Sequence, residues 1–230
     1  MHRNKRLTAF YYIVRIAMIL LIAASIVGIF ISKDEEDISR SIFVAIQAIV
    51  LLLLSFGPPA MEKRLKLDIP DLLEGFFLLF IIGGLIFGEV AGFFVAISWW
   101  DDMLHLVSGV LLAITSFSII NAAIKNPSNA LTLNPFFIAL FVFCFSMTIG
   151  VLWEFFEFTL DSLSTGSNMM RTFDSITLIP FEGLSAVRDT IHDLFLASIS
   201  SLVVSVLGYF DAKSGFKFIK KLLISPANQD

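Results

Sequence analysis

Long apolar runs, separated by short polar segments, dominate the chain. Six of them reach the roughly 20 residues that a helix needs to cross a bilayer. This pattern predicts an all-α polytopic transmembrane helix bundle. Residues 90–100 are open to two interpretations, because they can prolong the third span or form a short re-entrant segment. The predicted spans are residues 9–32, 38–57, 70–94, 102–124, 134–160 and 187–210.

The composition supports a membrane protein and excludes several other classes. Hydrophobic residues make up 57% of the 230 residues and charged residues 16%, whereas a soluble domain has about 45–50% and about 25%. A soluble globular domain and a disordered chain are therefore excluded. The single cysteine, Cys144, cannot form an internal disulfide, and a net charge of -4 does not suggest a nucleic-acid partner. Membrane lipids are the expected surroundings.

The chain is expected to form one integral membrane domain over residues 1–230, since no linker or internal repeat stands out. The first span has a basic start, but its apolar run is longer than that of a signal peptide, so we expect a retained anchor. Gly84, Gly88 and Gly92 form a stripe of small residues that lets another helix approach closely. That helix can belong to the same chain or to a second copy in a homo-oligomer.

Basic residues predict the orientation, since positive charge is retained in the cytoplasm. With six spans, both termini lie on one side of the membrane. That side carries most lysines and arginines, so both termini are predicted to be cytoplasmic. The basic residues on that side are Arg3, Lys5, Arg6, Lys63, Arg64, Lys66, Lys125, Lys213, Lys217, Lys220 and Lys221. The opposite side carries Lys33, Arg40, Arg171 and Arg188.

Ionisable residues gather where the fourth and sixth spans begin and where the fifth span ends. The six-span topology places these three groups at one depth, near the outer face. Charges at such positions are costly and mark a candidate functional site. Spacings of three and four residues place the members of each group on one helical face. The candidate site residues are Asp101, Asp102, His105, Glu154, Glu157, Asp189, His192 and Asp193.

Three kinds of chemistry fit this cluster. His105 with Asp101 or Asp102 is a base with an orienting partner, suited to proton transfer near neutral pH. A chain of carboxylates and histidines can also conduct protons or cations. Finally, histidines and carboxylates can bind a divalent metal such as zinc, iron or manganese. The candidate metal ligands are His105, Glu154, Glu157 and His192.

A purely structural interpretation explains part of the cluster. Acids in the first turn of a helix complement the helix dipole and cap free N–H groups, which accounts for Asp101 and Asp189. It does not account for Glu154 and Glu157, which lie near the end of a predicted helix, where acids are unfavourable. The two histidines are also left unexplained.

The long outer loop, residues 161–186, adds two candidate binding residues. A loop of this length is often a lid or a binding element. Arg171 within it and Arg188 just after it can clamp a phosphate or a carboxylate. Alternatively, each arginine balances the neighbouring acids.

Four motifs carry a resemblance to a known family. They are Trp-Trp-Asp-Asp-x-x-His-x-x-Ser-Gly at 99–109, Trp-Glu-x-x-Glu at 153–157, Gly-Ser-Asn-Met at 166–169 and Arg-Asp-Thr-x-x-Asp-Leu at 188–194. Together they resemble the uncharacterised YjdF-type family of bacterial inner-membrane proteins. The order of acids and histidine is also distantly similar to the VanZ-like membrane proteins. The resemblance implies a multi-pass protein of the bacterial plasma membrane and supplies motif positions, but no reaction.

Three function classes remain open from the sequence. The first is a membrane-embedded enzyme that acts near the outer leaflet on a lipid or envelope intermediate. The second is a small ion- or proton-coupled transporter, and the third is an accessory membrane protein with a structural polar cluster. Glu74 is the only acid expected at mid-depth or on the inner half of the bundle. The polar groups therefore favour a site on one side over a path across the membrane.

Overall fold

The structure is a computed structural model that describes residues 4–65, 67–124, 133–163, 167–214 and 225–226. Within these ranges, six helical segments are long and apolar enough to cross a membrane. The all-α polytopic bundle predicted from the sequence is therefore confirmed. The spanning segments are Lys5–Ile31, Glu35–Arg64, Asp71–Val90, Trp100–Asn121, Pro135–Leu163 and Gly183–Lys213.

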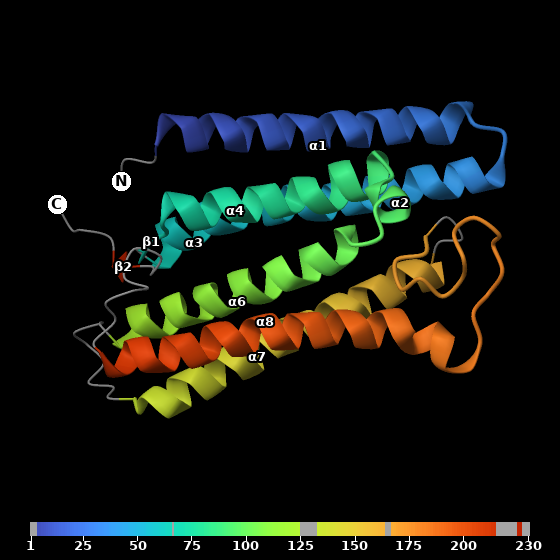
Figure 1. Ribbon diagram of the computed structural model, residues 1–230. Helices are drawn as coiled ribbons and strands as arrows, with labels where there is room; N and C mark the ends of the chain where they lie inside the picture. The colour runs from blue at the N-terminus through green and yellow to red at the C-terminus, as the bar shows by residue number, and fades with distance from the viewer. Residues whose placement is uncertain (1–3, 66, 125–132, 164–166, 215–224, 227–230) are drawn as a thin grey trace.

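The helices run back and forth along one axis, and α1 begins at the same end of the bundle where α8 ends (Figure 1). A two-residue antiparallel pairing of β1 with β2 lies at that end. The helices in chain order are α1 (Lys5–Ile31), α2 (Glu35–Leu54), α3 (Gly57–Leu65), α4 (Asp71–Ile81), the π-helix η1 (Ile82–Val90), α5 (Phe93–Ala96), α6 (Trp100–Ile124), α7 (Pro135–Leu163), the 3-10 helix η2 (Gly183–Val187) and α8 (Arg188–Lys213). The strands are β1 (Leu67–Asp68) and β2 (Ser225–Pro226).

The spanning helices form two groups of three. In the first group, α1 and α2 pack side by side along their length, and α4 with η1 closes the group. Buried side chains such as Val14, Met18 and Leu78 form its core. The Arg15 side chain donates to the backbone carbonyl of Ser55 at 2.9 Å. A cation near the last carbonyls of a helix is favourable, so this arginine holds the end of α2 against α1.

The second group consists of α6, α7 and α8, which all pack against one another. Gly109 of α6 lies against Ala197 of α8, and a Cβ atom at Gly109 would lie 2.7 Å from the carbonyl oxygen of Ala197. Small residues at such a crossing let two helix backbones approach closely. This contact lies one helical turn from His105 on α6 and one turn from Asp193 on α8, so it brings those two side chains toward each other.

The third span does not continue through residues 90–100. It ends as η1, and Gly92 follows in the left-handed region at φ 74°, which glycine adopts readily. The short α5 then packs back on η1, where the ring of Phe94 covers Gly88. Gly84 lines a cavity inside the chain. Thus the three glycines serve different local purposes, and the homo-oligomer contact inferred from their stripe stays a prediction.

Candidate functional site

Three helix ends meet at the end of the bundle opposite the start of α1. There α6 begins, α7 ends and α8 begins, and the segment between α7 and α8 lies over the same end (Figure 1). Asp101 and Asp102 lie in the first turn of α6, and Asp189 in the first turn of α8. The shared depth expected from the topology is thus what the structure shows.

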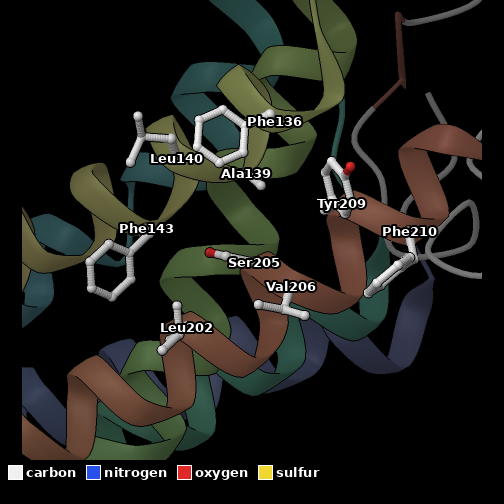
Figure 2. Close-up of a pocket in the computed structure, with 9 residues that line it drawn as sticks. All are labelled: Phe136, Ala139, Leu140, Phe143, Leu202, Ser205, Val206, Tyr209 and Phe210. Atoms are coloured by element: carbon white, nitrogen blue, oxygen red, sulfur yellow. The ribbon is translucent and has the colours of Figure 1, made fainter.

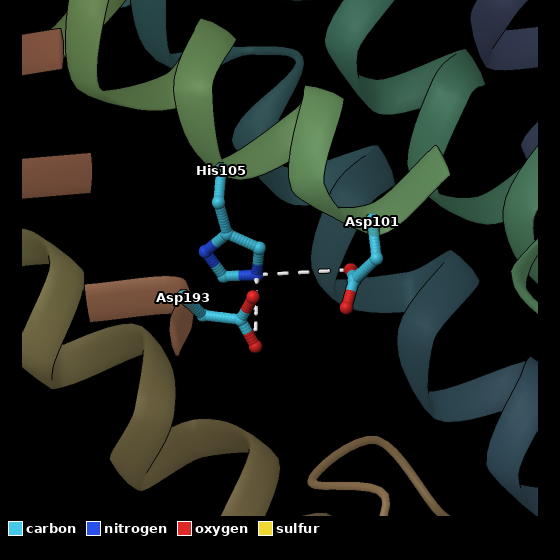
Figure 3. A group of neighbouring side chains, drawn as sticks. All are labelled: Asp101, His105 and Asp193. Atoms are coloured by element: carbon cyan, nitrogen blue, oxygen red, sulfur yellow. Dashed lines mark ion pairs between the residues drawn. The ribbon is translucent and has the colours of Figure 1, made fainter. Parts of the chain in front are cut away.

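His105 lies between two carboxylates that come from different helices. Its Nε2 atom is 3.7 Å from Oδ1 of Asp101, four residues earlier on α6, and 3.9 Å from Oδ2 of Asp193 on α8. Figure 3 shows both acids directed toward the imidazole ring. The side chains of His105 and Asp193 are only 11% and 2% exposed. This arrangement provides a buried base with two anionic partners, a combination used for proton transfer and for metal binding.

The second histidine forms a separate, more exposed pair. Nδ1 of His192 is 3.4 Å from Oδ1 of Asp102, and these side chains are 49% and 37% exposed. Neighbouring residues on a helix point about 100° apart, since a turn contains 3.6 residues. Therefore Asp193 faces the interior while His192, the residue before it, does not.

Glu154 and Glu157 are buried near the end of α7, and both line the same interior cavity as His105. The Trp153 indole N–H donates to Oε1 of Glu157 at 2.7 Å. The Thr190 side chain is close enough to interact with Glu154, but neither carboxylate oxygen of Glu154 makes a hydrogen bond of ordinary geometry among the described residues. A buried polar group without a partner is costly. The Glu154 carboxylate faces the cavity and can therefore form hydrogen bonds with a molecule bound there.

This cavity has a volume of about 240 Å³ and lies between the two helix groups. Its walls come from α2, α4, η1, α6, α7 and α8 and are mostly apolar. Asp101, His105, Glu154 and Glu157 line its polar part. Gln47 of α2 also lines it and donates from Nε2 to the Met169 sulfur at 3.4 Å. The cavity therefore connects an apolar space inside the bundle with the acid and histidine cluster.

Arg171, in the loop after α7, is the cation that pairs with the cluster. Its guanidinium lies 3.3 Å from Oδ2 of Asp101 and 3.6 Å from Oδ1 of Asp189. Its backbone has φ 46°, a left-handed conformation that residues other than glycine seldom adopt. Arg171 thus links the loop to the first turns of both α6 and α8. The interpretation that it balances neighbouring acids matches this geometry.

Two carboxylates also hold the loop, one near the end of α7 and one within the loop itself. Asp161 accepts hydrogen bonds from the Ser167 hydroxyl and from the backbone N–H groups of Met169 and Met170. Farther along, hydrogen bonds from the backbone N–H and the hydroxyl of Thr177 lower the pKa of Asp174 from its ordinary value of 3.8. Charged acceptors at these two places give the loop a defined path beside the cluster.

Several sequence-based expectations are resolved by this geometry. The four candidate ligands His105, Glu154, Glu157 and His192 do not form one ligand group among the described residues, because the two histidines belong to different acid pairs. Arg188 is exposed and forms no ion pair with a described residue. Sequence reasoning missed Gln47, although a lone amide within an apolar span is a usable signal.

A second cavity, of about 370 Å³, lies between α7 and α8 nearer the end where α8 terminates (Figure 2). Its lining includes the rings of Phe136, Phe143 and Phe210. Among the described residues, the lining has no carboxylate, histidine or cation, and its side-chain oxygens are the hydroxyls of Ser205 and Tyr209. The described part of the lining therefore offers no group for acid–base or metal chemistry.

Comparison with known proteins places the chain among membrane proteins. Residues 13–214 match a family described as predicted membrane protein (DUF2238). No curated protein and no solved structure matches the chain. The match covers all of the candidate site residues. It does not specifically support the likeness to YjdF-type or VanZ-like proteins, which stays a prediction.

Proposed function

The chain belongs to the DUF2238 family of predicted membrane proteins, and from that premise we propose that it is a membrane-embedded enzyme acting on an amphiphilic lipid or envelope intermediate. We take the site to lie at the outer leaflet of a bacterial plasma membrane, which the distribution of basic residues supports. The alternatives are an ion- or proton-coupled transporter and an accessory protein whose cluster is structural.

The observation that carries the proposal is the continuity between the interior cavity and the polar cluster. Apolar side chains from both helix groups line most of the cavity, while Asp101, His105, Glu154 and Glu157 line the rest. A ligand site of this kind is typically apolar with a few convergent polar groups. A molecule with an apolar chain and a polar head fits such a space, with its head beside His105.

The acids and the histidine then have different roles beside the polar head of the substrate. His105 is the proton donor or acceptor, because imidazole changes charge near neutral pH. Asp101 and Asp193 lie on either side of its Nε2 atom and orient and stabilise the ring. Glu154, which has no described hydrogen-bond partner, is free to bond a hydroxyl or amine of the substrate. The loop with Arg171 limits the access of water.

The proposal is tested with the lipids of cells from which the gene has been deleted. A total lipid extract of these cells is mixed with purified protein in proteoliposomes, and mass spectrometry follows the loss of one species and the appearance of another. Wild type should convert a species that accumulates in the deleted strain. Asp101→Asn and His105→Gln should slow this conversion by roughly 100-fold or more, the usual contribution of a general acid or base.

Asp71→Asn provides the matched control. Asp71 is also a first-turn acid of a spanning helix, but it is exposed and lies at the opposite end of the bundle. It should convert the lipid at the wild-type rate. If wild type and Asp101→Asn leave the extract equally unchanged, the enzyme proposal fails. Proton or cation flux into the same proteoliposomes, lost in His105→Gln, would favour transport instead.

A further inference from the structure

We propose that Asp101, His105 and Asp193 bind a divalent transition-metal ion, with zinc as the first candidate. One imidazole nitrogen and two carboxylate oxygens form a donor set that suits zinc, iron or manganese. Three protein ligands are also the usual number in a catalytic zinc site, where a fourth position is left for water or substrate. This set differs from the ligands expected from the sequence. A nitrogen that binds a metal cannot also exchange a proton, so with the ion bound the proton transfer proposed for His105 would fall to Glu154 instead.

The spacing of the three donor atoms is the first argument. All three lie within 4.8 Å of one another, and Nε2 of His105 is 3.7 Å and 3.9 Å from its two carboxylate neighbours. These separations are longer than hydrogen bonds. Two ligands that bind one tetrahedral zinc ion at about 2.1 Å lie roughly 3.4 Å apart. The two distances to the imidazole exceed this spacing by only a few tenths of an ångström. The oxygens of the two carboxylates lie within 4.8 Å of each other and would approach as the ion binds.

The second argument is the state of Asp193. The residue is 1% exposed, and its Oδ1 atom has no hydrogen-bond partner among the described residues. An ionised carboxylate buried in this way is costly unless it is paired or coordinates a metal. The other oxygen, Oδ2, is the atom directed at His105 (Figure 3). A cation between these groups would satisfy Asp193 directly.

The balance of charge points the same way. Six carboxylates gather around this point, and Arg171 is the cation that pairs with them among the described residues. It contacts Oδ2 of Asp101, whereas Oδ1 of Asp101 faces His105. One oxygen can thus bind an ion while the other is held by a neighbour, an arrangement that orients ligands in known metal sites. The six carboxylates are those of Asp101, Asp102, Glu154, Glu157, Asp189 and Asp193.

A second group of donors competes for the same acid. Asp102, His192 and Asp193 also lie within ligand distance of one another. Two of its members are well exposed, with side chains 49% and 37% accessible for His192 and Asp102, whereas His105 is 11% exposed. Water competes less with ligands in the buried group. Asp101 and His105 also line the cavity, so an ion there is within reach of a bound substrate.

The test measures metal content and metal-dependent melting of the detergent-purified full chain. Mass spectrometry of the elements should find about one zinc ion per wild-type chain. After chelation, added zinc chloride should raise the melting temperature of wild type, since a ligand that binds the folded state stabilises it. Manganese chloride serves as a second probe. His105→Gln and Asp193→Asn should lose bound metal and lose the zinc-dependent shift, with at least a roughly tenfold weaker affinity.

Two variants make the result specific. Asp71→Asn repeats the Asp193→Asn change at an exposed acid far from the site and should keep wild-type metal content. His192→Gln repeats the His105→Gln change and should also keep it. If His192→Gln loses the metal while His105→Gln retains it, the ion belongs to the exposed group and the proposal is overturned.

The proposal is also overturned if wild type contains no stoichiometric metal and neither zinc nor manganese changes its melting temperature after chelation. The wild-type measurement decides this outcome by itself, so the test remains valid even if His105→Gln folds poorly. Metal content is measured without any substrate. Absence of metal together with lipid conversion that depends on His105 would leave the enzyme proposal intact. Bound metal without lipid conversion would support the metal site and contradict the enzyme proposal.

Discussion

Gly109 gives the sharpest test of how packing positions the site. In Gly109→Ala, the new methyl group would meet the hydroxyl of Ser200, which can rotate away, and the backbone carbonyl oxygen of Ala197, which cannot. Increasing the second distance from 2.7 Å to an ordinary 3.4 Å requires α6 and α8 to separate locally by about 0.7 Å. Overpacking of this kind costs roughly 1–3 kcal/mol.

The separation of α6 and α8 should also change distances in the candidate site. His105 and Asp193 lie one helical turn from the two sides of this contact, so their 3.9 Å separation should lengthen to about 4.6 Å if the helices separate as rigid bodies. We therefore expect weaker zinc binding as well as lower stability. For a chain of this size the loss of stability corresponds to a melting temperature lower by about 2–12 °C.

Thermal unfolding in detergent, followed by circular dichroism, measures the first effect, and zinc titration measures the second. Gly75→Ala is the matched control, because nothing lies within 4 Å of a Cβ atom at that position of α4. It should be as stable as wild type or more stable by about 0.5–1 kcal/mol. A Gly109→Ala protein that melts with or above wild type would refute the close-packing argument.

Three further predictions concern the loop and the far end of the bundle. Asp161→Ala removes the acceptor of three loop hydrogen bonds, so trypsin should cleave after Arg171 faster than in wild type; an unchanged cleavage rate would contradict the anchoring role. Arg15→Ala removes the bonds to Ser55 and should lower the free energy of unfolding by roughly 1.5–3 kcal/mol, measured by denaturant titration in detergent. Because the pKa of Asp174 is lowered in the folded loop, its stabilisation of the turn is present above pH 3.8 and is lost as the pH falls through the lower folded value. Hydrogen exchange of the turn amides should show this acid loosening in wild type and not in Asp174→Asn.

The sequence was sufficient for the spans and for the depth of the polar groups. Helix length is fixed by bilayer thickness, and alternation of direction then places the ends of α6, α7 and α8 together. Helical spacing left either Asp101 or Asp102 as the partner of His105. In the structure Asp101 is the partner, at 3.7 Å, and Asp102 pairs with His192.

Contacts between helices could not be predicted from the sequence, because they depend on how each helix is rotated about its axis. His192 and Asp193 both carried candidate chemistry, yet adjacent helical positions cannot face the same way, and the rotation of α8 is set by the contact at Gly109. The local shape of the glycine stripe was also out of reach of the sequence. The stripe was drawn on a regular helix, whereas this segment is the π-helix η1, in which Gly88 lies against Phe94 and nothing lies within 4 Å of a Cβ atom at Gly84. The contact with a second copy stays a prediction.

The order of the helices along the chain has a consequence for membrane insertion. The acids of α6 and α7 are synthesised before Arg171 and before α8, which carries Asp193. Each ionised side chain left in lipid costs roughly 2.5–3.5 kcal/mol at mid-membrane and less near the surface. During synthesis, α6 and α7 must therefore keep their acids protonated or near the interface until the last helix arrives. When α8 then packs against α6 through Gly109 and Ala197, it shields the polar cluster from lipid.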